Sequence, residues 1–298
     1  MQDAQHTLIE VTFGKGKNGL AAKAFAQRRA QQTYQNEDSP DGQQILQPVT
    51  AEEINHGTYQ ISPADGSQYS PISPEYTFLR IADNPYTKYF MSDDWVSFAL
   101  NQIGGRGQLG EFRYAPIIGP DILSGILTRA TGKTVLDYAR EHLFDPLGIA
   151  IEKSLFFETK EEQMDFYKAT TNSCWVCGPN KINTAGWGLT LSAREMAAIG
   201  ECCIHGGQVD GKQIIPQAWL KESTRTQSCW EKRNLNYGYL WWIVEEAEPS
   251  FAALGDGGNA IYVNPQKNLV VAIASTFVPR VKDRIDFIRG QIEPLFCE

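Results

Sequence analysis

The sequence predicts an α+β fold in which an antiparallel sheet is flanked by helices and the middle of the chain is mostly helical. Three observations predict it. Helical periodicity recurs between residues 121 and 206, strand-like apolar segments follow after residue 237, and a last segment near the C-terminus presents one apolar stripe. Helices followed by antiparallel strands are typical of this fold class, with the last helix packed on the sheet.

The composition divides the chain near residue 75. Residues 1–75 hold eleven of the twenty glutamines and five aromatic residues, whereas all seven tryptophans lie in residues 76–298. Aromatic side chains supply much of the area that a core buries. We therefore expect residues 76–298 to form the main domain, and residues 1–75 to form a divergent, partly irregular segment with loop over 36–74.

Within that first segment, residues 7–11 predict one short strand. A turn at 16–19 follows, and positions spaced three and four apart from Leu20 to Arg28 then predict a helix. Thr12 and Lys15 are expected at the junction between this strand and this helix.

Capping signals set the helix boundaries in the middle of the chain. Asp121 is expected to cap a helix that stops at Gly132, and Thr134 to begin the next one. Ser192, followed three residues later by Glu195, predicts a capping box at the start of a further helix.

The last third of the chain alternates short turns and apolar segments. Residues 209–212 predict a tight hairpin, and Pro216 is expected to open a short helix that carries Trp219. Strands are predicted at 237–244, 260–263 and 269–277. Four aromatic residues of this region are expected to fill the core and a cleft wall: Tyr237, Tyr239, Trp241 and Trp242. The final helix should present one stripe of Ile285, Ile288, Ile292 and Leu295.

Charge and composition exclude several classes of protein. The 298 residues are 42% apolar and 21% charged, with a net charge of −8, which is typical of a folded globular protein and disfavours binding to nucleic acid. We find no apolar run of the length that a membrane span needs. The first residues lack the pattern of a secretory signal. We expect a cytoplasmic protein that acts without a cofactor.

The six cysteines are too sparse for a disulfide scaffold, which favours a reducing compartment. Cys174 and Cys177 have the spacing of metal ligands, and Cys202 and Cys203 follow, but no second matched pair exists. We expect buried free thiols, with a zinc site as the alternative, and we predict no metal.

Several motifs follow one another in an order that is found in one enzyme superfamily. They occupy residues 110–114, 143–149, 186–189, 192–196, 211–216, 237–242 and 256–259. In this order the chain resembles the serine β-lactamase and penicillin-binding protein superfamily, most of all its class C β-lactamase and esterase branch, over roughly residues 83–298. The resemblance implies a β-lactamase/DD-peptidase-like fold and hydrolysis through an acyl-enzyme.

The nucleophile of that family is a serine that lies three residues before a lysine on a helix. On a helix both side chains share one face, so the lysine can take the hydroxyl proton. None of the fifteen serines here has lysine three residues on, and the nearest equivalent is Thr12 with Lys15. The resemblance implies Thr12 as nucleophile and Lys15 as its base. The alternative is a helix cap and a solvated charge.

Tyr114 matches the family tyrosine that handles a proton near the nucleophile. The asparagine expected two residues later is replaced by Pro116, which has no N–H. Tyr114 is therefore either a proton shuttle or a core aromatic residue with its hydroxyl bonded to the backbone.

Residues 256–259 stand where the family carries its oxyanion strand. The glycines Gly257 and Gly258 allow a close approach of substrate, and the resemblance implies the N–H groups of Asn259 and Thr12 as oxyanion donors. Asp256 replaces a cation or an imidazole, which disfavours an anionic substrate. The alternative is an ordinary glycine-rich hairpin turn.

Two hypotheses for function follow. The first is a hydrolase of amide or ester bonds, acting on β-lactams, D-amino-acid peptides or small esters. The second is a catalytically inactive or truncated relative that keeps a ligand-binding cleft. The second accounts together for the missing serine and asparagine, for Asp256 and for the eleven residues before Thr12.

Overall fold

The computed structural model describes residues 7–16, 19–26, 29–35, 85–103, 112, 114, 117–169, 171–231, 234–275 and 283–296. The chain forms two compact units. The sheet unit consists of Met1–Pro48 with Leu191–Glu298, and the helical unit consists of Val49–Thr190. The boundary expected near residue 75 lies outside the described residues and stays a prediction.

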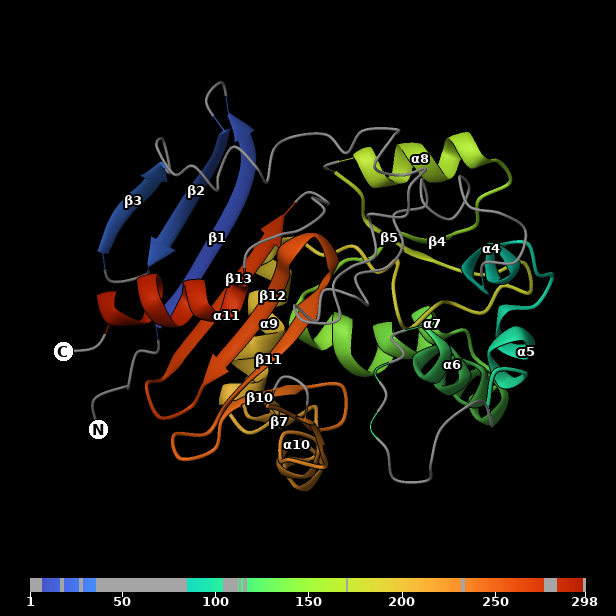
Figure 1. Ribbon diagram of the computed structural model, residues 1–298. Coiled ribbons are helices and arrows are strands. Elements are labelled where there is room, and N and C mark those ends of the chain that lie inside the picture. The colour runs from blue at the N-terminus through green and yellow to red at the C-terminus, as the bar shows by residue number, and fades with distance from the viewer. Residues whose placement is uncertain are drawn as a thin grey trace. The chain divides into compact units, whose positions relative to one another are not determined.

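The sheet unit is built on a nine-stranded sheet with the strand order β3-β2-β1-β13-β12-β11-β10-β9-β8 (Figure 1). Strand β1 pairs with β13 in parallel, and the other neighbours pair antiparallel. The strands are β1 (Thr7–Gly16), β2 (Gly19–Ala26), β3 (Arg29–Gln35), β8 (Ser228–Trp230), β9 (Leu235–Tyr237), β10 (Trp242–Glu245), β11 (Ser250–Gly255), β12 (Asn259–Asn264) and β13 (Leu269–Ser275). The predicted α+β class is confirmed.

Strand β13 is buried on both faces, which explains its unbroken apolar sequence. Leu269, Val271 and Ile273 pack with the C-terminal helical segment, which runs through α11 (Arg284–Phe287), η6 (Ile288–Ile292) and η7 (Glu293–Leu295). Helix α9 (Ala193–Ile204) covers the opposite face (Figure 1). The predicted C-terminal stripe is correct at Ile288 and Ile292. It is wrong at Leu295, which is 40% exposed where the chain tightens into η7.

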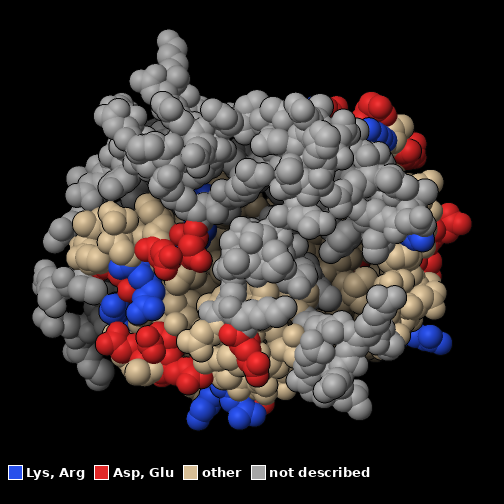
Figure 2. All heavy atoms as spheres, viewed as in Figure 1, with Lys and Arg blue, Asp and Glu red and all other residues tan. Residues whose placement is uncertain are grey.

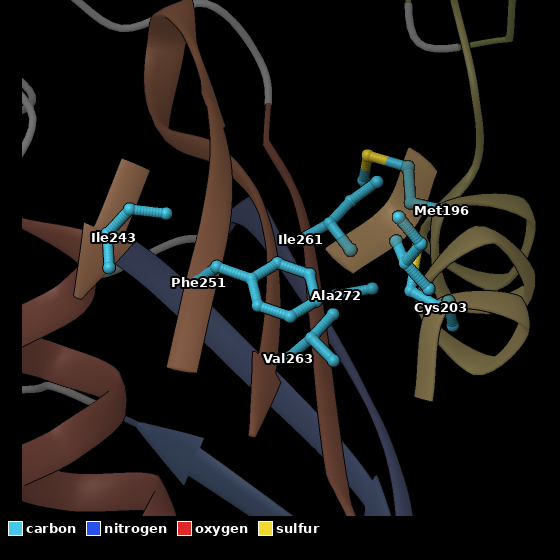
Figure 3. Close-up of a cluster of buried hydrophobic side chains, with 9 residues drawn as sticks. Met196, Cys203, Ile243, Phe251, Ile261, Val263 and Ala272 are labelled. Carbon is cyan, nitrogen blue, oxygen red and sulfur yellow. The ribbon is translucent and has the colours of Figure 1, made fainter. Parts of the chain in front are cut away.

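The start of α9 confirms the predicted capping box of Ser192 and Glu195. One side of the helix then packs on the sheet. Figure 3 shows Met196 and Cys203 of α9 facing Ile261 and other apolar side chains of the strands. This contact gives the sheet unit its second buried layer.

The helix expected between Leu20 and Arg28 is wrong over residues 20–26, because these residues belong to β2. The strand predicted at 7–11 is present and extends to Gly16 as β1. Backbone pairing of β2 with β1 replaces the helical hydrogen bonds that the local spacing favoured. Pairing with a distant strand has overridden a short local pattern.

The single strand expected over 237–244 is also wrong. The chain reverses between β9 and β10, where the Gly238 N–H donates to the Trp241 carbonyl at 2.8 Å and Leu240 adopts φ 64°. Tyr239 is consequently 45% exposed instead of lying in the core, whereas Trp242 is buried as expected.

Other local predictions in the sheet unit are confirmed. The hairpin joins β6 (Gln208–Val209) to β7 (Lys212–Gln213), with positive φ at Asp210 and Gly211 as its tight turn requires. Pro216 precedes α10 (Gln217–Ser223), which carries Trp219.

The helical unit contains short helices and one small parallel strand pair. These are α4 (Pro85–Phe90), α5 (Trp95–Leu100), α6 (Ile118–Thr131), α7 (Val135–Ala139), η2 (Arg140–Phe144), η3 (Asp145–Leu147), α8 (Lys160–Lys168), β4 (Lys153–Leu155) and β5 (Cys174–Val176). Gly132 ends α6 at φ 70°, and Thr134 caps α7, as predicted. Asp121 does not cap α6, which begins before it at Ile118.

Two further features of the molecule are the length of the described helices and the charge of the described surface. None of the helices that the structure describes is long and apolar enough to cross a bilayer. On the face drawn in Figure 2, acidic and basic side chains lie interspersed. The described part of that face therefore carries mixed charge.

Gly200 marks a close contact between α9 and β13, because a Cβ there would lie 2.5 Å from Cγ1 of Val270. We expect Gly200→Ala to lower the free energy of unfolding by about 1–2 kcal/mol, since overpacking outweighs the better helix propensity of alanine. Gly290→Ala is the matched control, because a Cβ there meets nothing within 4 Å. Urea unfolding measures both variants, and a Gly200→Ala protein as stable as the control would contradict this packing.

Candidate functional site

The turn of residues 256–259 is fixed by the end of strand β13. It comprises η5 (Asp256–Gly258), between β11 and β12, and both Gly257 and Gly258 are buried with positive φ. The Ser275 hydroxyl donates to the Gly257 carbonyl, and the Ser275 N–H donates to Oδ1 of Asn259 at 2.9 Å. The turn is therefore tied to the sheet at two points, unlike a loose glycine-rich loop.

A cation that the sequence did not reveal contacts the same turn. Nε of Arg284, at the start of α11, donates to the Gly258 carbonyl at 3.0 Å. Burial lowers the pKa of the Arg284 guanidinium, while Asp283 acts in the opposite direction. Arginine nevertheless stays charged near neutral pH. The expectation that Asp256 disfavours an anionic substrate stays a prediction, and Arg284 adds positive charge beside the same turn.

The structure places Thr12 and Lys15 on β1, where Thr12 is paired with Ala274 of β13 and Lys15 with Leu20 of β2. Positions three apart on a strand lie on opposite faces. Thr12 and Lys15 therefore do not share the helical face on which a lysine can take the proton of the nucleophile. Their catalytic roles stay predictions, and the geometric reason for joining them is lost.

The sheet register does bring position 12 to the end of the sheet that carries the turn. Phe13 is paired with Ser275, and Ser275 is hydrogen bonded to both Gly257 and Asn259. Two of the predicted elements of the site, the strand that carries position 12 and the turn of residues 256–259, therefore lie at the same end of one sheet, on either side of the end of β13. The role of the Asn259 N–H as oxyanion donor stays a prediction.

Tyr114 belongs to the helical unit and is half-buried. Pro116 and the other residues directly beside it lie outside the described residues. Its role as proton shuttle stays a prediction, as does its alternative role in a core.

The helical unit holds a buried carboxylate that the sequence presented as a helix cap. Asp121 is only 2% exposed, and it accepts hydrogen bonds from the Tyr89 hydroxyl at 2.5 Å and from the N–H groups of Ala185 and Gly186 at 3.0 and 3.4 Å. Trp187 Nε1 donates to the Tyr89 oxygen at 3.2 Å. This network fixes the motif at 186–189 to α4 and α6.

Burial dominates the electrostatics of this network. It raises the pKa of Asp121, although the hydrogen bond from Tyr89 and those from the backbone act in the opposite direction. Burial, assisted by the neighbouring carboxylate, raises the pKa of Tyr89 well above its usual value. Asp121 thus acts as a hydrogen-bond acceptor and Tyr89 as a donor, and together they stabilise the packing of α4, α6 and residues 185–187.

Aromatic rings surround Trp187 in the same unit. Phe90 and Trp95 lie at centroid distances of 5.3 and 5.7 Å. Phe157 and Tyr167 lie nearly parallel to the indole, both at 6.4 Å. The Trp187 ring is therefore held by packing as well as by its hydrogen bond.

The expectation of buried free thiols is confirmed for Cys174, Cys177, Cys202 and Cys203. Burial raises the pKa of each, and that of Cys203 to about 12, so these thiols stay protonated and unreactive. Among the described residues, no three or more His, Cys, Asp or Glu side chains gather closely enough to hold a metal ion.

Comparison with known families identifies the class of protein. The family described as Beta-lactamase matches residues 110–291. Because this match covers more than half of the sequence, the chain belongs to the beta-lactamase family. The resemblance read from the order of the motifs is thereby confirmed.

Individual relatives are distant. The 6-aminohexanoate-dimer hydrolase of Paenarthrobacter ureafaciens is 21% identical over 248 residues, which cover 80% of this chain and 55% of that protein. An uncharacterized protein of Alkalihalophilus pseudofirmus is 25% identical over 225 residues, which cover 64% of this chain and 65% of that protein. The chain thus spans only 55% and 65% of the lengths of these relatives.

One solved structure is also distantly similar to this chain. A penicillin-binding protein homolog from Caulobacter crescentus has a TM-score of 0.40 and 15% identity, covering 61% of this chain and 60% of that one.

Gly258→Ala tests how tightly the turn is held. We expect it to destabilise the protein by about 1 kcal/mol more than Gly132→Ala, because both positions have positive φ but a Cβ at Gly258 would lie 2.4 Å from Nη2 of Arg284 and would displace this side chain from its hydrogen bond to the Gly258 carbonyl. At Gly132 a Cβ meets nothing within 4 Å. Thermal unfolding of the two variants measures the difference, and equal losses would mean that the hydrogen bond of Arg284 to the turn adds no stability.

Asp121→Asn tests the buried carboxylate through the pH dependence of stability. The folded protein holds the Asp121 proton to a higher pH than the unfolded chain does, so this residue's contribution to stability falls as pH rises from about 4. We expect the wild-type protein to lose stability relative to Asp121→Asn across that window. Urea unfolding of both proteins between pH 4 and 7 measures this change, and a wild-type stability that stays constant or rises relative to that of Asp121→Asn would contradict the assignment.

Proposed function

We propose that this member of the beta-lactamase family hydrolyses amide or ester bonds through an acyl-enzyme. The observation that carries the proposal is the fixed turn of Gly257, Gly258 and Asn259, at the end of the sheet toward which the register of β1 also brings position 12. A rigid backbone turn can aim an N–H group at a developing oxyanion without reorganising during the reaction.

The proposed chemistry follows the family scheme. A hydroxyl oxygen, proposed to be that of Thr12, attacks the substrate carbonyl, and the oxyanion is held by the N–H groups of Thr12 and Asn259. The attacking hydroxyl group gives its proton to a general base, which passes it to the leaving amine or alcohol, and the roles of Lys15 and Tyr114 in this transfer stay predictions. Water then attacks the acyl-enzyme and releases the acid, so that the hydroxyl group is regenerated.

The substrate class is narrowed by two considerations. One curated relative is named a 6-aminohexanoate-dimer hydrolase, which supports a short amide as substrate for this chain. The Arg284 guanidinium at Gly258 supports a substrate with a carboxylate, because it places positive charge on the turn. D-amino-acid peptides and β-lactams share an amide and a carboxylate, and small esters remain the simplest test substrates.

A second candidate function is favoured by the position of Thr12 and Lys15 on a strand. A strand puts positions three apart on opposite faces, so Lys15 is not held beside the Thr12 hydroxyl as a helix would hold it. A relative that binds ligands with the turn but does not form an acyl-enzyme accounts for this geometry and for the absence of a serine with lysine three residues on.

Intact mass spectrometry distinguishes the two candidates. The full chain is incubated with a penicillin, with p-nitrophenyl acetate and with the linear dimer of 6-aminohexanoate, beside Thr12→Val and the matched control Thr7→Val on the same strand. If the proposal is correct, a stoichiometric acyl adduct forms on the parent and on Thr7→Val but not on Thr12→Val.

Two other results would decide between the candidates or change the residue assignment. An adduct that persists on Thr12→Val keeps the acyl-enzyme and overturns Thr12 as nucleophile. No adduct with any of the three donors, in protein whose cooperative unfolding shows that it is folded, favours the non-catalytic candidate.

A further inference from the structure

The Asn259 side chain extends the hydrogen bonding of the sheet beside the turn of residues 256–259. The ladder between β12 and β13 ends where Ala260 is paired with Ile273. Beyond that pair, Oδ1 of Asn259 accepts a hydrogen bond from the Ser275 N–H at 2.9 Å. A side-chain oxygen thus joins the two strands at a point where their backbone pairing has ended.

Gly255 leaves room for this side chain. It is paired with Asn259 across β11 and β12. A Cβ at Gly255 would lie 3.3 Å from Cβ of Asn259, which is an unusually close contact. The backbone of Asn259 is therefore held by β11 and its side chain by β13, so this residue is fixed from both neighbouring strands.

The two residues before Asn259 are the least restrained by the chain itself. Gly257 has φ 72° and Gly258 has φ 93°, and glycine adopts positive and negative φ about equally well. A change of φ or ψ at either glycine would turn the Asn259 N–H. The Ser275 hydroxyl donates to the Gly257 carbonyl, so it restrains the first of these glycines directly.

Ser275 also relates the turn to position 12. In the parallel pairing of β1 with β13, Ser275 lies opposite Phe13, the residue after Thr12. The two N–H groups proposed as oxyanion donors, those of Thr12 and Asn259, are therefore both positioned relative to Ser275. Donors that are fixed before the reaction stabilise an oxyanion most, because they need not reorganise as its charge develops.

We propose that Ser275 and the Asn259 side chain are positioning residues, which hold the Asn259 N–H in the direction of the oxyanion. The inference rests on the proposed function, because both groups act through that N–H. Neither group contacts the substrate: Ser275 acts through the Gly257 carbonyl and Asn259, and the Asn259 side chain acts through its own backbone. Loss of a contact made only in the transition state lowers kcat and leaves KM unchanged.

Steady-state hydrolysis of p-nitrophenyl acetate by the full chain tests the proposal, because the released p-nitrophenolate gives kcat and KM separately. We expect Asn259→Ala and Ser275→Ala to lower kcat about tenfold or more, with KM within about twofold of the wild type. The same N–H groups serve the formation and the hydrolysis of the acyl-enzyme, so both steps slow together. Ser275→Thr keeps the hydroxyl group and should restore most of kcat.

Asn236→Ala and Ser228→Ala are the matched controls. Asn236 of β9 donates a side-chain hydrogen bond to Glu246 at 3.0 Å, and Ser228 begins β8. Both are half-buried strand residues of the same sheet, outside the turn, and we expect both variants to keep kcat. Thermal unfolding verifies that each variant is folded at the assay temperature. If Asn259→Ala is unfolded there, Ser275→Ala compared with Ser275→Thr carries the test.

The results separate this inference from the proposed function. If the wild-type chain is active but both alanine variants keep the kcat of their controls, only the inference is overturned. A raised KM at unchanged kcat also overturns it, because the groups would then bind substrate. If the wild-type chain does not accelerate the release of p-nitrophenolate, the inference is overturned, and intact mass spectrometry then shows whether the proposed function has failed as well.

Discussion

Strands β12 and β13 are covered on both faces, by α9 on one side and by the C-terminal helical segment on the other. Alternate residues of β13 serve the two layers, and Leu269 to Ile273 are at most 1% exposed. Burying a side chain of this kind contributes about 1.5–3 kcal/mol. The position of these two strands therefore sets where every neighbouring element of the sheet unit can lie, including β1 beside β13.

The candidate site depends on that buried pair of strands. The turn of residues 256–259 joins β11 to β12, Ser275 ends β13, and Arg284 begins the helical segment that covers the sheet. The turn is rigid because each of its partners belongs to an element held by the core. In the helical unit, Asp121 performs the corresponding task by tying the backbone of residues 185–186 to α6.

Features with local signals could be predicted from the sequence. Ser192 and Glu195 contact each other within one turn, and Gly132 ends its helix by its own conformation. Features that depend on distant partners could not. Residues 20–26 become a strand only because β1 pairs with them while itself pairing with β13. Asp121 resembles a cap until its bond to Ala185, 64 residues away, is known. Arg284 lies in no motif shared with Gly258.

Strand β1 is an interior strand between β2 and β13, which brings position 12 to the end of the sheet that carries the turn and puts Thr12 and Lys15 on opposite faces. Hydrogen–deuterium exchange of the full chain, followed by mass spectrometry of peptides over residues 7–16, tests this most directly. We expect amide protection of β1 close to that of β12, because both strands have hydrogen-bonded neighbours on each side. Exchange of residues 7–16 within seconds, while β12 stays protected, would contradict it.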